Sequence, residues 1–344
     1  MAGSLMHASF GLVGGKAMFS PIWKAMEGSP KFIQFNPALL ECLKDWKYIL
    51  KNMMKNPTDI SLLVAEYPHY TAYLDACGLG AGGVLLAGSL DFPPIVWQIE
   101  WPTEIKERFK KHEITINDLE LAAIVLAWLS FENILTDMSN IRIGLSCDNT
   151  SAVAWNQKGS SSTSKVAGRL LRMLYLRVRD KGAGEAMTTN IAGIHNVLAD
   201  IASRAFKDGK FFAANQNLIS YFNSHFPLQQ NESWQQFHLP IEWTSRVMSC
   251  LLGKQPAVES LRRLKRTGKS TLGTGSTTVK NFKWTPYSDS TQTQKSASQP
   301  WHLLHGSGKV ATAMELQSKW DKSLKHSRPS PRPLNWQEQP VPST

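Results

Sequence analysis

The chain has 344 residues, of which 42% are hydrophobic, so it is long enough for one substantial domain with extensions or for two small ones. No run of about 18 apolar residues occurs, which excludes a helical membrane span, and the first residues lack the basic and apolar blocks of a secretory signal. The four cysteines follow neither a CxxC nor a zinc-finger spacing, so we expect reduced thiols in an intracellular protein of the cytoplasm or nucleus.

Positive charge is concentrated in the C-terminal part of the chain. The whole chain carries 38 Lys and Arg against 27 Asp and Glu, a net charge of +11. Residues 244–344 hold 16 basic and 5 acidic residues, whereas residues 1–243 hold 22 of each, so the C-terminal part carries the entire excess. A neutral body with a basic tail favours nucleic acid as a partner, although a solvated tail without any partner fits the same composition.

The first predicted elements are one helix, three strands and a second helix. Residues 36–56 have apolar side chains at three- and four-residue spacing, which predicts an amphipathic helix. Residues 71–100 form three short apolar segments separated by glycine- and proline-rich turns, a pattern typical of an antiparallel meander. Residues 117–129 form the clearest predicted helix, with Thr115 or Asn117 as its N-cap.

The later elements alternate between strands and helices. They are a strand at 141–148, helices at 151–157 and 165–180, a strand at 185–194 and a helix at 197–206. This order predicts an α/β fold with a five-stranded mixed sheet flanked by helices on both faces. Less regular apolar residues at 211–252 predict further helices, and the polar, proline-containing composition beyond residue 267 predicts a largely disordered tail.

Four carboxylates occupy positions where a structural protein rarely buries a charge. Asp75 lies inside the first strand, Glu120 in an apolar helix, Asp148 at the end of the fourth strand, and Asp200 at the start of the last helix. Burying an isolated carboxylate is costly unless it is paired or binds a cation. Oxygen ligands without Cys or His favour magnesium or manganese, and a pair of such ions promotes phosphodiester hydrolysis. The acids therefore predict a site for two Mg²⁺ ions, with Mn²⁺ as an alternative.

Each acid also has an ordinary structural interpretation. Asp75 can cap a turn, and Glu120 can be a first-turn charge that reaches solvent. Asp148 can cap the helix that follows it, and Asp200 can be a first-turn acid. Their joint order on the first strand, the second helix, the fourth strand and the last helix favours a common site.

Four motifs resemble the ribonuclease H domain of retroelement reverse transcriptases, including those of LTR retrotransposons, pararetroviruses and DIRS-like elements. The motifs are LDACGLGAGGVL, INDLELAAIVLAW, LSCDNTSAVAW and GIHNVLADIASR. The resemblance covers residues 70–207 and implies a ribonuclease H-like fold in which Asp75, Glu120, Asp148 and Asp200 are both metal ligands and catalytic residues. It also implies a metal-dependent endonuclease that cleaves the RNA strand of an RNA–DNA hybrid, leaving 5′-phosphate and 3′-hydroxyl ends.

The resemblance divides the chain into four parts. Residues 1–68 resemble the segment between polymerase and nuclease, and residues 69–208 are the ribonuclease H-like domain. Residues 209–266 are expected to be a helical extension and residues 267–344 the basic, largely disordered tail. No polymerase motif with paired aspartates occurs, so we expect any reverse-transcriptase polymerase domain to act in trans.

One departure from the family concerns a histidine. Many relatives carry a mobile-loop His ten residues before the last catalytic Asp, and this chain has Asn190 there. His195, five residues before Asp200, is therefore a candidate catalytic residue, and an ordinary role in orienting the loop also fits.

Contacts with nucleic acid are expected from two groups of residues. Asn149 and Thr150, next to the fourth-strand acid, are candidates for contacts with the strand backbone. The helix at 165–180 has a basic side that can follow a phosphate backbone, and an ordinary solvated face fits as well. Its candidate binding residues are Lys165, Arg169 and Arg172, and Arg177 and Arg179 extend the same side.

Two other functions remain open. The chain can be a catalytically inactive, nucleic-acid-binding remnant of a retroelement, but retention of all four acids argues against decay of the site. It can also be an integrase-like nuclease of the same superfold, since fold alone does not decide function. The early Glu120 argues against that, because integrases take their Glu from a late helix.

Overall fold

The computed structural model describes residues 2–28, 31–53, 57–63, 67–87, 92–204, 217–228 and 233–254. The basic tail predicted at 267–344, together with its expected binding of nucleic acid, lies outside these residues. None of the described helices combines the length and the apolar character that crossing a membrane requires.

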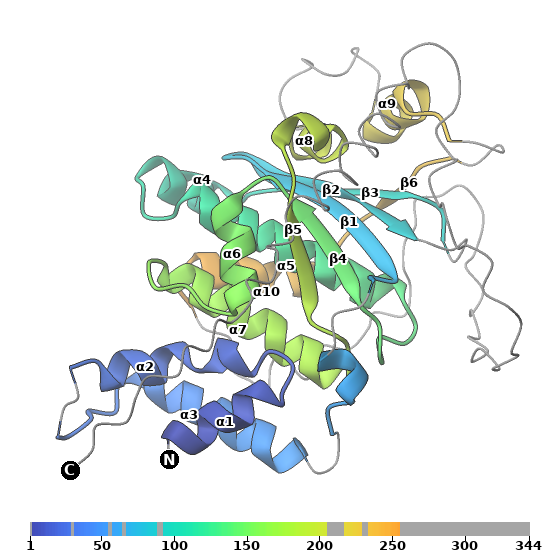
Figure 1. Ribbon diagram of the computed structural model, residues 1–344. Helices are drawn as coiled ribbons and strands as arrows, with labels where there is room; N and C mark the ends of the chain where they lie inside the picture. The colour runs from blue at the N-terminus through green and yellow to red at the C-terminus, as the bar shows by residue number, and fades with distance from the viewer. Residues whose placement is uncertain are drawn as a thin grey trace, which may run out of the picture. The chain divides into compact units, whose positions relative to one another are not determined.

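A six-stranded mixed sheet forms the centre of the described fold, in the order β5-β4-β1-β2-β3-β6 (Figure 1). Strands β1 (Tyr70–Ala76), β2 (Gly80–Ala87) and β3 (Ile95–Glu100) form the predicted antiparallel meander. Strand β4 (Ile143–Cys147) pairs in parallel with β1, and β5 (Ala186–Asn190) pairs in parallel with β4. The α/β class and the mixed sheet are confirmed, but the sheet has one strand more than the five predicted.

The additional strand is β6 (Gln235–Phe237), which pairs in parallel with β3 at the edge of the sheet. It lies in a region where only helices were predicted. Three residues are too few to show the alternation of apolar and polar positions that identifies a strand. Only pairing with Ile95–Trp97, far away in the sequence, gives this segment its strand conformation.

Helices cover both faces of the sheet, as predicted. Val84 on β2 belongs to a small core with residues of α8 and α9, whereas its neighbour Leu85 belongs to the main core. Successive strand residues point to opposite faces, so these two cores lie on opposite sides of the sheet. The described α-helices that follow β3 along the chain are α4 (Thr103–Lys110), α5 (Ile116–Ile134), α6 (Thr150–Lys158), α7 (Lys165–Asp180), α8 (Val197–Arg204), α9 (Leu218–His225) and α10 (Ile241–Leu251).

Helix α5 is buried along nearly its whole length. Thr115 forms a capping box with Asp118, so Thr115 rather than Asn117 is the N-cap. All side chains from 118 to 133 are buried, including those of Trp128 and Phe131. A helix that is apolar on every side needs neighbours on every side, and this burial fixes α5 firmly in the core.

The N-terminal segment packs onto the rest of the fold through α7. It contains α1 (Ala2–Phe10), a 3₁₀ turn η1 (Gly15–Met18), α2 (Ser20–Met26) and α3 (Pro37–Met53), followed by η2 (Ile60–Leu63). Helix α3 confirms the helix predicted at 36–56. Asp45 of α3 forms an ion pair with Arg172 of α7, and the Tyr48 hydroxyl donates to Asp180 at 3.0 Å. Leu39, Trp46 and Ile49 join the main core.

Candidate metal centre

The four predicted acids come from four different elements that meet at one edge of the sheet. Asp75 lies near the end of β1, and Asp148 follows directly after the end of β4. Because β1 and β4 are parallel neighbours, their carboxyl ends lie at the same edge. Glu120 is in the second turn of α5, and Asp200 is in the first turn of α8.

Electrostatic interactions link the four carboxylates. The charges of Asp148 and Asp200 repel Asp75, and the charges of Asp75 and Asp148 repel Glu120. The charge of Asp200 also repels Asp148. Each carboxylate therefore repels at least two of the others. One oxygen each of Glu120 and Asp148 and the sulfur of Cys147 lie within 4.8 Å of one another, so these three side chains are close enough to share a cation.

Asp75 is a buried acid on strand β1. Burial raises its pKa from 3.8 to about 6, and repulsion by Asp148 and Asp200 adds to this rise. A hydrogen bond from the Ser203 hydroxyl acts in the opposite direction, because it stabilises the carboxylate. The alternative interpretation of Asp75 as a turn cap does not account for its burial beside other acids.

Glu120 is the most strongly perturbed acid of the cluster. Its side chain points into the buried site rather than to solvent, and the residue is only 4% exposed. Burial, together with repulsion by Asp75 and Asp148, raises its pKa from 4.5 to about 9. Without a cation this carboxyl is therefore protonated at neutral pH.

Asp148 does not cap the helix that follows it. Asn149 is the N-cap of α6, where its Oδ1 accepts from the Ala152 amide at 2.9 Å and its Nδ2 donates to Asn117 at 2.8 Å. The cap interpretation of Asp148 is therefore wrong, and its carboxylate remains directed to the cluster, where burial raises its pKa. Thr150, the other expected backbone contact, is exposed at the first position of α6.

Helix α8 is held against the sheet by very close contacts. Gly82 lies opposite Asp75 in the ladder, and a Cβ at this position would lie 2.4 Å from the Ala202 carbonyl carbon. The buried Asn196 side chain donates to the Leu74 carbonyl at 2.9 Å. Together with the hydrogen bond from Ser203, these contacts fix the side of the cluster that carries Asp200.

Asp200 is more accessible than the buried Asp75 and Glu120. Its side chain is 42% exposed and forms an ion pair with Arg204, one helical turn later. Exposed pairs of this kind contribute little to stability. Arg204 nevertheless places a positive charge beside the cluster and favours the ionised form of Asp75.

Cys147 is a site residue that the sequence analysis did not single out. Its buried thiol donates to Glu120 Oε2 at 3.5 Å, and burial strongly raises its pKa. The available signal was its place directly before Asp148, at the end of the same strand. The thiol therefore adds one soft donor to a set otherwise made of oxygens.

His195 lies beside the cluster in a 3₁₀ turn, η3 (Gly193–His195), and is exposed. A Cβ on Gly193 would lie 3.0 Å from Asp148 Oδ2, so this turn passes directly over the fourth-strand acid. Within the described part of the chain, no hydrogen bond joins the His195 imidazole to the four carboxylates. Its proposed catalytic role therefore stays a prediction.

The basic side of α7 differs from the expectation. Arg172 is only 5% exposed and donates two hydrogen bonds to Asp45, so the prediction that it binds nucleic acid is wrong. Arg177 is likewise buried, where it pairs with Glu132 and lies 4.8 Å from the Trp243 ring. Sequence periodicity cannot reveal such partners because they come from other helices. Lys165 is exposed and Arg169 partly exposed at the start of the helix.

The fold and the site together define an α/β protein with a partly buried cluster of carboxylates beside the carboxyl ends of two adjacent parallel strands. A scan against protein-family models and a search of curated proteins found no match for this chain.

Proposed function

We propose that the chain is a metal-dependent endonuclease of the ribonuclease H type, which hydrolyses the RNA strand of RNA–DNA hybrids. The observation that carries the proposal is the convergence of Asp75, Glu120, Asp148 and Asp200, where burial, together with repulsion between the acids, raises the pKa of Asp75 to about 6 and that of Glu120 to about 9. Burying several carboxylates close together costs free energy, and bound divalent cations would offset that cost by neutralising the negative charge.

The donor set fits hard divalent ions such as Mg²⁺ or Mn²⁺. Carboxylates from four elements supply oxygen ligands, and the oxygens of Glu120 and Asp148 are close enough for one cation to bind both. Held by these carboxylates, a pair of such ions would supply activation of water and stabilisation of the leaving 3′ oxygen. The Cys147 thiol is a weaker partner for such ions, and its hydrogen bond to Glu120 makes it a positioning group.

Neighbouring residues of the protein position the side chains of the site for this chemistry. Glu120 is fixed by the core helix α5, and Asp75 is oriented by the hydrogen bond from Ser203. His195, exposed on the turn over Asp148, is placed to assist proton transfer or product release. Selection of the hybrid would rest on shape and 2′-hydroxyl contacts rather than on base sequence.

The four motifs also support an origin in a retroelement reverse transcriptase. On this proposal, the helical segment at 1–68 corresponds to the region that precedes the nuclease in such polyproteins. Its close packing on α7, through Asp45 and Tyr48, makes it a supporting layer for the nuclease domain.

Cleavage of a labelled hybrid by the full chain tests the proposal. We expect cleavage of the RNA strand with Mg²⁺, none with EDTA, and none by Asp148→Asn, because the variant loses a ligand while keeping its shape. The matched control is Asp137→Asn, which should cleave normally. Asp137 is an exposed loop residue, and its carboxylate accepts a hydrogen bond from the Ser139 amide.

The same experiment separates the alternatives. Binding of the hybrid without cleavage in Mg²⁺ or Mn²⁺ would refute the nuclease and favour an inactive, nucleic-acid-binding remnant. Cleavage that Asp148→Asn retains would contradict the assignment of the site.

A further inference from the structure

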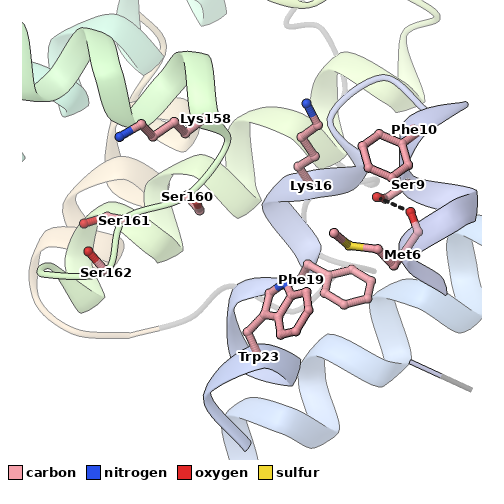
Figure 2. A pocket seen from close by; sticks show the side chains of 10 residues that line it. All are labelled: Met6, Ser9, Phe10, Lys16, Phe19, Trp23, Lys158, Ser160, Ser161 and Ser162. Atoms are coloured by element: carbon pink, nitrogen blue, oxygen red, sulfur yellow. Dashed lines mark hydrogen bonds between the residues drawn. The ribbon is translucent and has the colours of Figure 1, made fainter. Parts of the chain in front are cut away.

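A cavity of about 320 Å³ lies between the N-terminal helices and the loop that joins α6 to α7 (Figure 2). Its volume is at the lower end of the range for small-molecule sites. Figure 2 shows aromatic side chains of the N-terminal helices on one side and the serines of the loop on the other. No residue of the carboxylate cluster lines it, so it is a separate site.

Two aromatic side chains of this cavity are unusually exposed. Phe10 of α1 is 58% exposed and Trp23 of α2 is 52% exposed. The Trp23 ring packs against the buried Phe19 ring, with 5.7 Å between the ring centres, and Phe19 makes an edge contact with Trp46, with 5.9 Å between those ring centres. Trp23 is therefore held by packing on one side, and its exposed surface can stack on a planar ring.

The cavity is positively charged at its rim. Lys16 and Lys158 both line it, and Lys16 Nζ lies 5.7 Å from the centre of the Phe10 ring. No carboxylate lines the cavity, and neither lysine forms an ion pair with the described residues. The serine hydroxyls of residues 160–162 add hydrogen-bond donors. A ligand with planar rings and negative charges is complementary to this lining.

The two sides of the cavity are joined by close packing. The backbone at Gly159, with φ +65°, passes so near η1 that a Cβ there would lie 3.3 Å from the Ala17 nitrogen. On the same side of the fold, the Gly14 amide donates to Glu185 Oε1 at 3.1 Å. The loop itself is ordered by Ser161, whose hydroxyl accepts from the Ser164 amide at 3.0 Å. The two walls of the cavity are therefore fixed by contacts within the protein.

From these observations we propose that the cavity binds unpaired, single-stranded nucleic acid. Bases stack on Trp23 and Phe10, and phosphates contact Lys16 and Lys158, the combination that single-strand-binding surfaces use. The chain's own C-terminal part is a poor occupant, because residues 244–344 carry 16 basic and 5 acidic residues and would be repelled by the two lysines.

Helix α6 connects this cavity with the carboxylate cluster. The helix begins after Asp148 and ends at Lys158 on the cavity rim, a rise of about 12 Å for its length. A strand that advances roughly 3.4 Å per nucleotide covers this distance in about four nucleotides. The inference does not depend on cleavage, since the cavity shares no residue with the cluster.

Photocrosslinking tests the inference on the full chain in EDTA. The probe is a halogenated oligothymidylate of about eight nucleotides, used at raised salt so that phosphate-only binding elsewhere is weakened. We expect crosslinks on Phe10 and Trp23. We also expect Trp23→Ala to weaken binding of this strand by about tenfold, in the range for loss of one base stack, and Lys16→Glu with Lys158→Glu to weaken it further.

Matched controls are Phe32→Ala and Lys24→Glu, which alter exposed residues outside the cavity and should leave the affinity unchanged. A blunt duplex of the same length should bind without the Trp23 contribution, because its bases are already stacked. Unchanged affinity of Trp23→Ala, or crosslinks confined to residues outside the cavity, would overturn the inference. Because these side chains are exposed, a thermal melt that matches the wild type shows that each variant is folded.

Discussion

Replacing Glu120 by Gln should remove most of the pH dependence of stability of the metal-free protein. The Glu120 pKa is raised from 4.5 to about 9 in the folded state, mainly by burial. Between these pH values the carboxyl is protonated in the folded protein and ionised in the unfolded chain. Folding then takes up a proton, so the free energy of unfolding falls as the pH rises.

The size of this effect follows from the linkage relation. One proton taken up on folding corresponds to about 1.4 kcal/mol per pH unit, so Glu120 alone should lower the free energy of unfolding by roughly 3 kcal/mol between about pH 6 and pH 8. Gln cannot ionise and has nearly the same shape. The variant should therefore be more stable than the wild type at about pH 8, and the difference should shrink toward about pH 5.

Urea denaturation in EDTA across this pH range measures the effect. Glu104→Gln is the matched control, because Glu104 is exposed in the first turn of α4, and it should retain the wild-type pH profile. Adding Mg²⁺ should stabilise the wild type more than Glu120→Gln, since the variant has lost a ligand. Parallel pH profiles for the wild type and Glu120→Gln would refute the account of burial and repulsion at this site.

Three further substitutions test how the site is supported. Gly82→Ala should lower the free energy of unfolding by about 1–3 kcal/mol in urea, because its Cβ would lie 2.4 Å from the Ala202 carbonyl carbon and push α8 away from the sheet. Asp45→Asn should cost about 3 kcal/mol or more, because it leaves the buried Arg172 without its counter-charge, and a thermal melt that hardly changes would contradict this. Thr115→Ala should cost about 1 kcal/mol through loss of the N-cap, measured by chemical denaturation against wild type.

Local patterns predicted the elements that carry the site. The meander of β1 to β3 and the helix around Glu120 have clear periodicity, so their existence was predictable from sequence alone. Asp75 lies on the predicted meander, whereas Asp148 and Asp200 lie on the later strand and helix that were also predicted. Asp75 and Asp148 meet because the carboxyl ends of the parallel strands β1 and β4 share an edge.

Features that depend on distant partners could not be predicted from local patterns. Arg172 has the spacing of a solvated basic face, but its environment is set by Asp45, 127 residues earlier in the chain. Strand β6 exists only through its pairing with β3. The role of Cys147 was hidden for a similar reason, because burial and the nearby Glu120 define it, and both come from tertiary packing.

Arg204 provides the cluster with a positive charge from the protein itself, at its partly exposed edge. Its guanidinium pairs with the partly exposed Asp200, while the buried Glu120 is neutralised by a proton. On the proposed function, a divalent ion that bound here would displace the guanidinium from Asp200 and the proton from Glu120. We expect ion uptake to release protons from the core side and to free Arg204, which would then face an approaching phosphate.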